Sequence, residues 1–302
     1  MLSFLPPLVR GIISALLLII NTLVWCWPLF VLTLLKLLLP IPALQKRLLD
    51  GLHWVAETWM HFNGMWMDLA GHIEWDLQGL EALERDKSYL LISNHQTWVD
   101  IMALLYPLNR RAPFYKFFLK QNLLWVPIVG LAWWALEYPF MKRYSKEYLA
   151  KYPEKQGQDL VTIRTACERY KNSPVTVISY VEGTRFTPAK HAQQQSPYRH
   201  LLKPRAGGVA LVLDAMGEQL HAIANTTLAY PDGRPTFWQL MCGQIRRISL
   251  HVELLPVPAQ FIGRNYATDA TYQDEFRDWI NAIWQAKDAQ LQRLLDSDQT
   301  GH

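Results

Sequence analysis

The chain has 302 residues, of which 50% are hydrophobic and 19% charged, and it carries 30 basic against 26 acidic side chains. This composition excludes a mainly disordered chain, because disorder combines low hydrophobicity with high net charge. The length allows one large or two small domains with a real core. A net charge of +4 is slight for a protein that binds nucleic acid, so we expect no nucleic-acid partner.

The N-terminal part contains a long uncharged segment, because no charged residue lies between Arg10 and Lys36. About 20 apolar residues cross a bilayer core, so this segment is long enough to span a membrane. A secretory signal peptide would have a shorter apolar region followed by a small-residue cleavage site, which this sequence lacks. Pro28 lies inside the segment, so it could form one kinked spanning helix or two short helices that enter and return as a hairpin.

Basic residues flank the apolar segment unevenly, with Arg10 before it and Lys36, Lys46 and Arg47 after it. This bias favours a cytoplasmic location for the part that follows. We therefore expect a membrane anchor over residues 1–43 and one globular catalytic domain over residues 44–302.

The globular part alternates apolar strand-like runs with helical patterns, which predicts an α/β layer structure. The apolar stretch 123–140 suits either plain core or a surface that dips into lipid. The predicted strands are 89–93, 113–118, 175–181, 220–228 and 245–255, and the predicted helices are 44–72, 99–106, 160–171, 207–216 and 272–295.

Metal and disulfide chemistry find no support in the pattern of cysteines and histidines. Cys26, Cys167 and Cys242 lie far apart and form no CxxC or Cys/His metal spacing, and His61 and His72 do not make an HExxH pair. We expect no metal site, no disulfide framework and a reducing compartment.

A histidine and an aspartate follow the first predicted strand in the pattern His95-x4-Asp100. A carboxylate can fix the tautomer of an imidazole and stabilise its charged form, so this pair suits general-base catalysis. The spacing Thr97-x-x-Asp100 also resembles a capping box, in which Asp100 would cap a helix that begins near Trp98. The two roles are compatible.

A second polar motif, Glu182-Gly183-Thr184-Arg185, follows another apolar strand. Gly183 allows a tight turn, and the guanidinium of Arg185 has the planar fork that suits phosphate. The same four residues could equally form a surface turn with an ion pair.

Together the motifs resemble those of the glycerophospholipid acyltransferase family, which includes the 1-acylglycerol-3-phosphate acyltransferases. The resemblance covers about residues 85–230. Its blocks are Asn94-His95-x4-Asp100, then Lys120-x2-Leu123-x3-Pro127-x2-Gly130 closing with Phe140-Met141-Lys142-Arg143, and Glu182-Gly183-Thr184-Arg185. Val181 stands where the family usually has proline, Lys142 stands where it often has aspartate, and residues 221–224 lack the proline of the fourth block.

The resemblance implies a fold, a reaction and roles for the motif residues. The fold is a mixed sheet flanked by helices, of the glycerol-phosphate acyltransferase type, preceded by an N-terminal membrane helix or helical hairpin. The family needs no cofactor, because acyl-CoA or acyl-carrier protein is a co-substrate. His95 would be the base oriented by Asp100, while Lys120, Arg143 and Arg185 would bind the phosphate of the acceptor, and Glu182, Gly183 and Thr184 would position the acceptor or the oxyanion.

We therefore expect a membrane-bound acyltransferase of phospholipid biosynthesis that acylates the sn-2 hydroxyl of lysophosphatidate to give phosphatidate. Its partners would be the lysophospholipid, the acyl thioester and the bilayer, with the catalytic domain on the cytoplasmic side of a bacterial inner membrane. The alternatives are an acyltransferase with another lysophospholipid or glycerol-phosphate acceptor, a thioester hydrolase that uses water, and a scaffold without activity.

Overall fold

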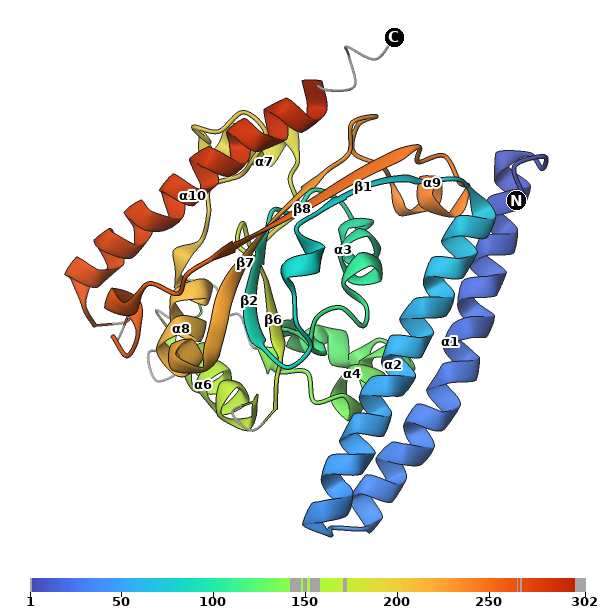
Figure 1. The fold of residues 1–302 in the computed structure, drawn as a ribbon, viewed down its shortest axis with the longest axis horizontal. Coiled ribbons are helices and arrows are strands. Elements are labelled where there is room, and N and C mark those ends of the chain that lie inside the picture. Colours follow the sequence, from blue (N-terminus) through green and yellow to red (C-terminus); the bar gives the residue numbers. More distant parts are fainter. Residues whose placement is uncertain are drawn as a thin grey trace.

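A computed structural model describes residues 2–141, 148, 151–152, 158–170, 173–264, 266 and 268–296. At its centre lies a six-stranded sheet with strand order β1-β8-β7-β2-β6-β3 (Figure 1). The strands are β1 (Glu74–Gln78), β2 (Ser88–Ser93), β3 (Tyr115–Phe117), β6 (Thr176–Tyr180), β7 (Leu220–Ala229) and β8 (Arg247–Leu255). A separate pair joins β4 (Leu119–Lys120) to β5 (Phe140–Met141).

The sheet is mixed, as expected. The strands β7, β2, β6 and β3 are parallel to one another, whereas β8 is antiparallel to β7 and carries the parallel edge strand β1. The strands β7, β2 and β6 are direct neighbours, so their carboxyl ends meet at one edge of the sheet. In open α/β sheets this edge is where ligands bind.

Helices cover both faces of the sheet and bury its apolar side chains (Figure 1). One core lies between the sheet and the helices α6 (Gln158–Tyr170), α8 (Ala206–Met216) and α10 (Ala270–Asp296). The other lies against α2 (Pro42–Ala70), α3 (Asp100–Leu108) and α9 (Phe237–Met241). The remaining elements are α4 (Val129–Ala135), α7 (Pro188–Gln194) and the 3₁₀ turns Leu80–Ala82, Gln121–Trp125, Gly217–Gln219 and Ala259–Phe261.

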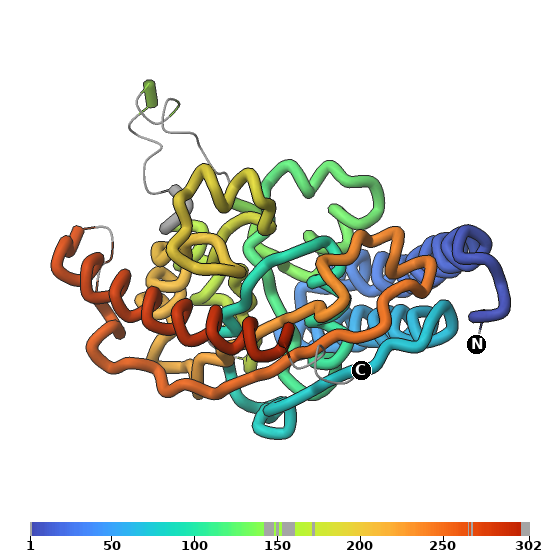
Figure 2. The backbone as a smooth tube through the Cα atoms, turned by 90° about the horizontal axis from the view of Figure 1, so that it is seen from above, coloured from blue at the N-terminus to red at the C-terminus, as the bar shows by residue number. Residues whose placement is uncertain are grey.

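The N-terminal apolar segment forms one helix, α1 (Pro7–Leu38), which continues through Pro28. Of the two arrangements considered for this segment, the structure therefore has the single helix and not two short ones. A short turn at 39–41 leads into α2, and the two helices lie side by side along one side of the molecule (Figures 1 and 2). By length and composition α1 is the one helix in the described part of the chain that could cross a membrane.

One side of α1 faces away from the protein with apolar side chains, and the exposed fraction of Trp27 on it is 74%. The stretch 123–140 also departs from the plain-core interpretation, because Trp125 on the turn before α4 is 81% exposed. Further exposed apolar side chains in this stretch are Ile128, Leu131 and Trp134. α1 and α4 contact each other, so two neighbouring elements present apolar surface.

The predicted strands and helices are all present, with ends shifted by a few residues. The strand β1 was not predicted, because its sequence EWDLQ is too polar to suggest one. It forms as an edge strand that pairs with β8 over its whole length.

Candidate active site

The two sequence motifs meet at the carboxyl edge of the sheet because they follow neighbouring parallel strands. Residues Ser93 of β2 and Tyr180 of β6 are paired in register, so the segments beginning at Asn94 and Val181 leave the sheet side by side. Asn94 extends this edge towards β7: its side-chain amide donates to the carbonyl of Leu228 at 2.8 Å and accepts from the N–H of Leu228 at 2.9 Å.

His95 and Asp100 form a direct pair, with 2.7 Å between Nδ1 of His95 and Oδ2 of Asp100. The side chain of Asp100 is fully buried and that of His95 is 16% exposed. Because an ionised carboxylate only accepts hydrogen bonds, Nδ1 is the donor and the lone pair of the neutral ring lies on Nε2. The pair therefore has the geometry of a base held by a carboxylate.

Asp100 also binds the backbone at the start of α3. Its Oδ2 accepts from the N–H groups of Gln96 at 2.5 Å and Thr97 at 3.0 Å, and Val99 N–H donates to the hydroxyl of Thr97. Asp100 therefore makes the contacts of both predicted roles, because its carboxylate binds the backbone of the turn as well as the imidazole of His95.

Two tyrosines complete the surroundings of the pair, and sequence reasoning missed both. The Tyr230 hydroxyl, just beyond β7, donates to Oδ1 of Asp100 at 2.7 Å. The ring of Tyr180 stacks on the ring of His95 with 4.0 Å between centroids, while its buried hydroxyl has no partner within the described residues. The available signal was a tyrosine at the carboxyl end of each strand, since Tyr180 ends β6 and Tyr230 directly follows β7.

Glu182 lies beneath the second motif as a buried carboxylate. Its oxygens accept from the N–H groups of His95 and Leu202, each at 3.4 Å, so it links both motif segments to the loop before α8. Burial raises the pKa of Glu182 to about 8. These contacts give Glu182 a role in holding the site together from inside.

Gly183 and Thr184 shape the turn that follows. Gly183 has φ +68°, a conformation that favours glycine, and a Cβ there would lie 3.0 Å from Cδ of Arg205, whose side chain would have to shift. The N–H of Gly183 donates to the carbonyl of Tyr180 and is engaged in the turn. The hydroxyl of Thr184 accepts from the ammonium of Lys190 at 2.7 Å.

The three cations predicted to bind phosphate are placed differently. The guanidinium of Arg185 lies over the ring of Trp98, 4.0 Å from its centroid, beside the start of α3. Lys120 is exposed at the end of β4. Arg143 lies outside the described residues.

An apolar cavity of about 310 Å³ opens beside His95. Its wall includes Tyr180 and side chains from α1, α2, α3 and α4, so it extends from the catalytic pair into the space between the helical pair and the sheet. From α1 and α2 come Thr22, Trp25, Cys26, Leu29, Val55, Ala56, Trp59 and Met60. A chamber of this kind suits a hydrocarbon chain.

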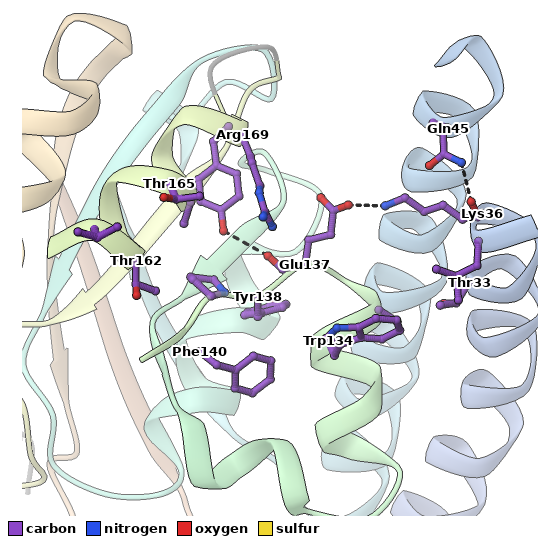
Figure 3. A pocket seen from close by; sticks show the side chains of 16 residues that line it. Thr33, Lys36, Gln45, Trp134, Glu137, Tyr138, Phe140, Thr162, Thr165 and Arg169 are labelled. Carbon is purple, nitrogen blue, oxygen red and sulfur yellow. Dashed lines mark hydrogen bonds and ion pairs between the residues drawn. The ribbon is translucent and has the colours of Figure 1, made fainter. Parts of the chain in front are cut away.

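A second cavity, of about 530 Å³, lies between the end of α1, the α4–β5 segment and α6 (Figure 3). Lys36 of α1 forms an ion pair with Glu137, and the hydroxyl of Tyr170 donates to the backbone carbonyl of Glu137 (Figure 3). None of the predicted site residues that the structure describes lines this cavity. Over the same residues, no cluster of three His, Cys, Asp or Glu side chains could hold a metal ion.

Comparison with known proteins gives concordant matches. A family model described as "Acyltransferase" matches residues 74–230. 1-Acyl-sn-glycerol-3-phosphate acyltransferase delta from Homo sapiens is 26% identical over 185 residues, which cover 58% of this chain and 44% of that protein. 1-Acyl-sn-glycerol-3-phosphate acyltransferase 2 from Brassica napus is 24% identical over 273 residues, covering 81% of this chain and 62% of that protein.

Each of these matches spans less than two thirds of the relative. The crystal structure of the 1-acyl-sn-glycerophosphate (LPA) acyltransferase from Thermotoga maritima superposes with a TM-score of 0.52 at 16% identity, over 95% of this chain and 97% of that one. This similarity shows a shared fold. The matched family segment begins at β1, ends at Tyr230 and covers more than half of the chain, which therefore belongs to the acyltransferase family.

Proposed function

We propose that the chain is a membrane-bound 1-acylglycerol-3-phosphate O-acyltransferase that moves a fatty acyl group from acyl-CoA or acyl-carrier protein to the sn-2 hydroxyl of lysophosphatidate. The observation that carries the proposal is the His95–Asp100 pair at the mouth of an apolar cavity. The curated relatives that it matches bear the same activity in their names.

The reaction needs one base and no protein nucleophile. Nε2 of His95 takes the proton of the acceptor hydroxyl as its oxygen attacks the carbonyl carbon of the thioester. Asp100 holds Nδ1–H and stabilises the imidazolium that forms. When the tetrahedral intermediate collapses, the C–S bond breaks and His95 returns the proton to the leaving thiolate, so that ester and thiol are released.

The negative oxygen of the intermediate needs fixed donors, each typically worth about 3 kcal/mol of barrier. The N–H groups of Gln96 and Thr97 bind Asp100, and that of Gly183 binds Tyr180. Among the described residues, the N–H groups of Trp98 and Thr184 have no acceptor. These two amides, one from each motif, are our candidates for the oxyanion hole.

The apolar cavity would hold the acyl chain of the donor, with the thioester carbonyl next to His95. Burying each methylene contributes about 0.8 kcal/mol, so a chamber of limited volume favours acyl chains that fill it. Its wall is built partly by α1 and α2, which makes the N-terminal helices part of the substrate site as well as an anchor.

Membrane attachment rests on the exposed apolar surface of α1 and of the neighbouring α4 segment. We assign residues 1–43 to the anchor and 44–302 to the catalytic domain. The basic flank after α1 supports a cytoplasmic side for that domain, and the membrane that we propose is the inner membrane of a bacterium. Acceptor and product both reside in the bilayer, so this placement would bring them to His95 without leaving the lipid.

The test uses membranes that carry the chain, labelled acyl-CoA or acyl-carrier protein, and a panel of lysophospholipids, with His95→Ala as the inactive partner. Phosphatidate formed from lysophosphatidate, and lost in His95→Ala, supports the proposal. If only a different lysophospholipid is acylated, the proposed mechanism stands and the proposed acceptor is wrong. Hydrolysis of the thioester without transfer, or activity independent of His95, contradicts it.

A further inference from the structure

Cations gather near the turn that carries the second motif, two from its own segment and two from farther along the chain. Arg185 lies on Trp98, and Lys190 binds the hydroxyl of Thr184 and the carbonyl of Arg185. The side chain of Arg205 passes over Gly183. A fourth cation, Arg234, belongs to the loop between β7 and α9, which no motif covers.

Arg234 is placed close to the catalytic pair by a short chain of contacts. Its guanidinium lies over the ring of Phe186, 3.8 Å from the centroid. Phe186 is buried, and its N–H donates to the carbonyl of His95 at 2.8 Å. Phe186 therefore contacts both this guanidinium, through its ring, and the backbone of the proposed base, through its N–H.

The electrostatic environment of Arg234 also indicates that it lies near the catalytic pair. Partial burial lowers the pKa of Arg234, while the charges of Glu182 and Asp100 act in the opposite direction. Both of these carboxylates belong to the site, so Arg234 lies within their electrostatic reach. The carboxylate oxygens of Glu182 and Asp100 already accept hydrogen bonds from the donors described above.

No carboxylate pairs with Arg234 within the described residues. Arg246, which reaches the same β7–α9 loop, forms an ion pair with Asp232 at 2.8 Å. The guanidiniums of Arg185 and Arg234 instead rest on aromatic faces, and neither forms an ion pair with a described residue. A guanidinium stacked in this way keeps its N–H edge available, and that planar edge is the geometry that binds phosphate oxygens in pairs.

We infer that Arg234 binds the phosphate monoester of the acceptor together with Arg185, so that the acceptor is selected for a dianionic headgroup. The inference rests on the proposed function and adds to it a residue outside every motif. One guanidinium is held by Trp98 and the other by Phe186, the residue directly after Arg185. A neutral or zwitterionic headgroup gains less from this pair than a phosphate monoester does.

The experiment compares Arg234→Gln and Arg234→Lys with Arg246→Gln as the matched control, after equal melting temperatures show that each variant is folded. Steady-state kinetics are measured with lysophosphatidate and with monoacylglycerol, which lacks the phosphate. We expect Arg234→Gln to raise KM for lysophosphatidate about tenfold or more, since hydrogen bonds to charged groups are strong. The KM of Arg234→Lys for lysophosphatidate should lie between those of the wild type and Arg234→Gln, because lysine keeps the charge and lacks the planar guanidinium.

The KM for the acyl donor and the KM for monoacylglycerol should not change. An unchanged KM for lysophosphatidate in Arg234→Gln, or an equal rise for both acceptors, overturns the inference. A second arm measures binding of lysophosphatidate micelles by calorimetry, without turnover. If the wild-type protein transfers no acyl group to lysophosphatidate, the proposed function fails. Arg234 is then judged by binding alone: weaker binding in Arg234→Gln than in Arg246→Gln supports the inference, and equal binding overturns it.

Discussion

Removing the hydroxyl of Tyr230 tests whether the carboxylate of Asp100 is held as the structure indicates. In Tyr230→Phe the ring stays in place, and Oδ1 of Asp100 loses the one donor that the described residues provide. Leaving a buried acceptor unsatisfied costs about 1–3 kcal/mol, and more for a charged group. We expect the free energy of unfolding in urea to fall by about that amount.

The same change should lower catalysis. Oδ2 of Asp100 holds Nδ1 of His95, so a carboxylate that has lost its Tyr230 donor holds the imidazole less firmly in the orientation that the reaction needs. We expect kcat/KM in the acyl-transfer assay to fall by about tenfold, which corresponds to about 1.4 kcal/mol of barrier.

Tyr180→Phe is the matched control, because the hydroxyl it removes is buried without a partner among the described residues and the ring stacked on His95 remains. This variant should keep its stability and its kcat/KM. If Tyr230→Phe loses stability but keeps kcat/KM, Tyr230 is only structural. If neither quantity changes, our account of how Asp100 is held is refuted.

Three further predictions concern the cavity, the buried glutamate and the turn. Ala132→Phe, which fills part of the cavity wall, should shift the preferred acyl chain to shorter lengths in a chain-length panel, and an unchanged optimum would place the chain elsewhere. Burial raises the pKa of Glu182 to about 8 against about 4.3 in an unfolded chain, so the folded state keeps this proton longer and stability should fall as pH rises between these values. Glu182→Gln should flatten that slope in urea titrations; an unaltered slope would contradict the assignment. Gly183→Ala should lower the unfolding free energy by about 1 kcal/mol or more, because φ is +68° and Arg205 must move, and a neutral result would show that the turn can relax.

The local part of the site follows from the sequence alone. His95 and Asp100 lie five residues apart, between the end of a strand at Ser93 and the start of a helix at Asp100. This short connection brings the two side chains into contact. The apolar runs of β2, β6 and β7 were recognisable because buried parallel strands are apolar on both faces. The mixed α/β fold was predicted correctly on these grounds, and the family was predicted correctly from the resemblance of the ordered motif blocks.

Only the tertiary structure decided which distant residues join that pair. Tyr230 and Arg234 reach the site because β7 is the neighbour of β2 in the sheet, and strand order cannot be read from a sequence pattern. The polar strand β1 forms because β8 offers it a partner. The cavity exists because α1 and α2 pack beside the sheet without filling the space next to His95. Sequence spacing fixes contacts within a turn or a helix, whereas contacts across more than a hundred residues depend on how the elements pack.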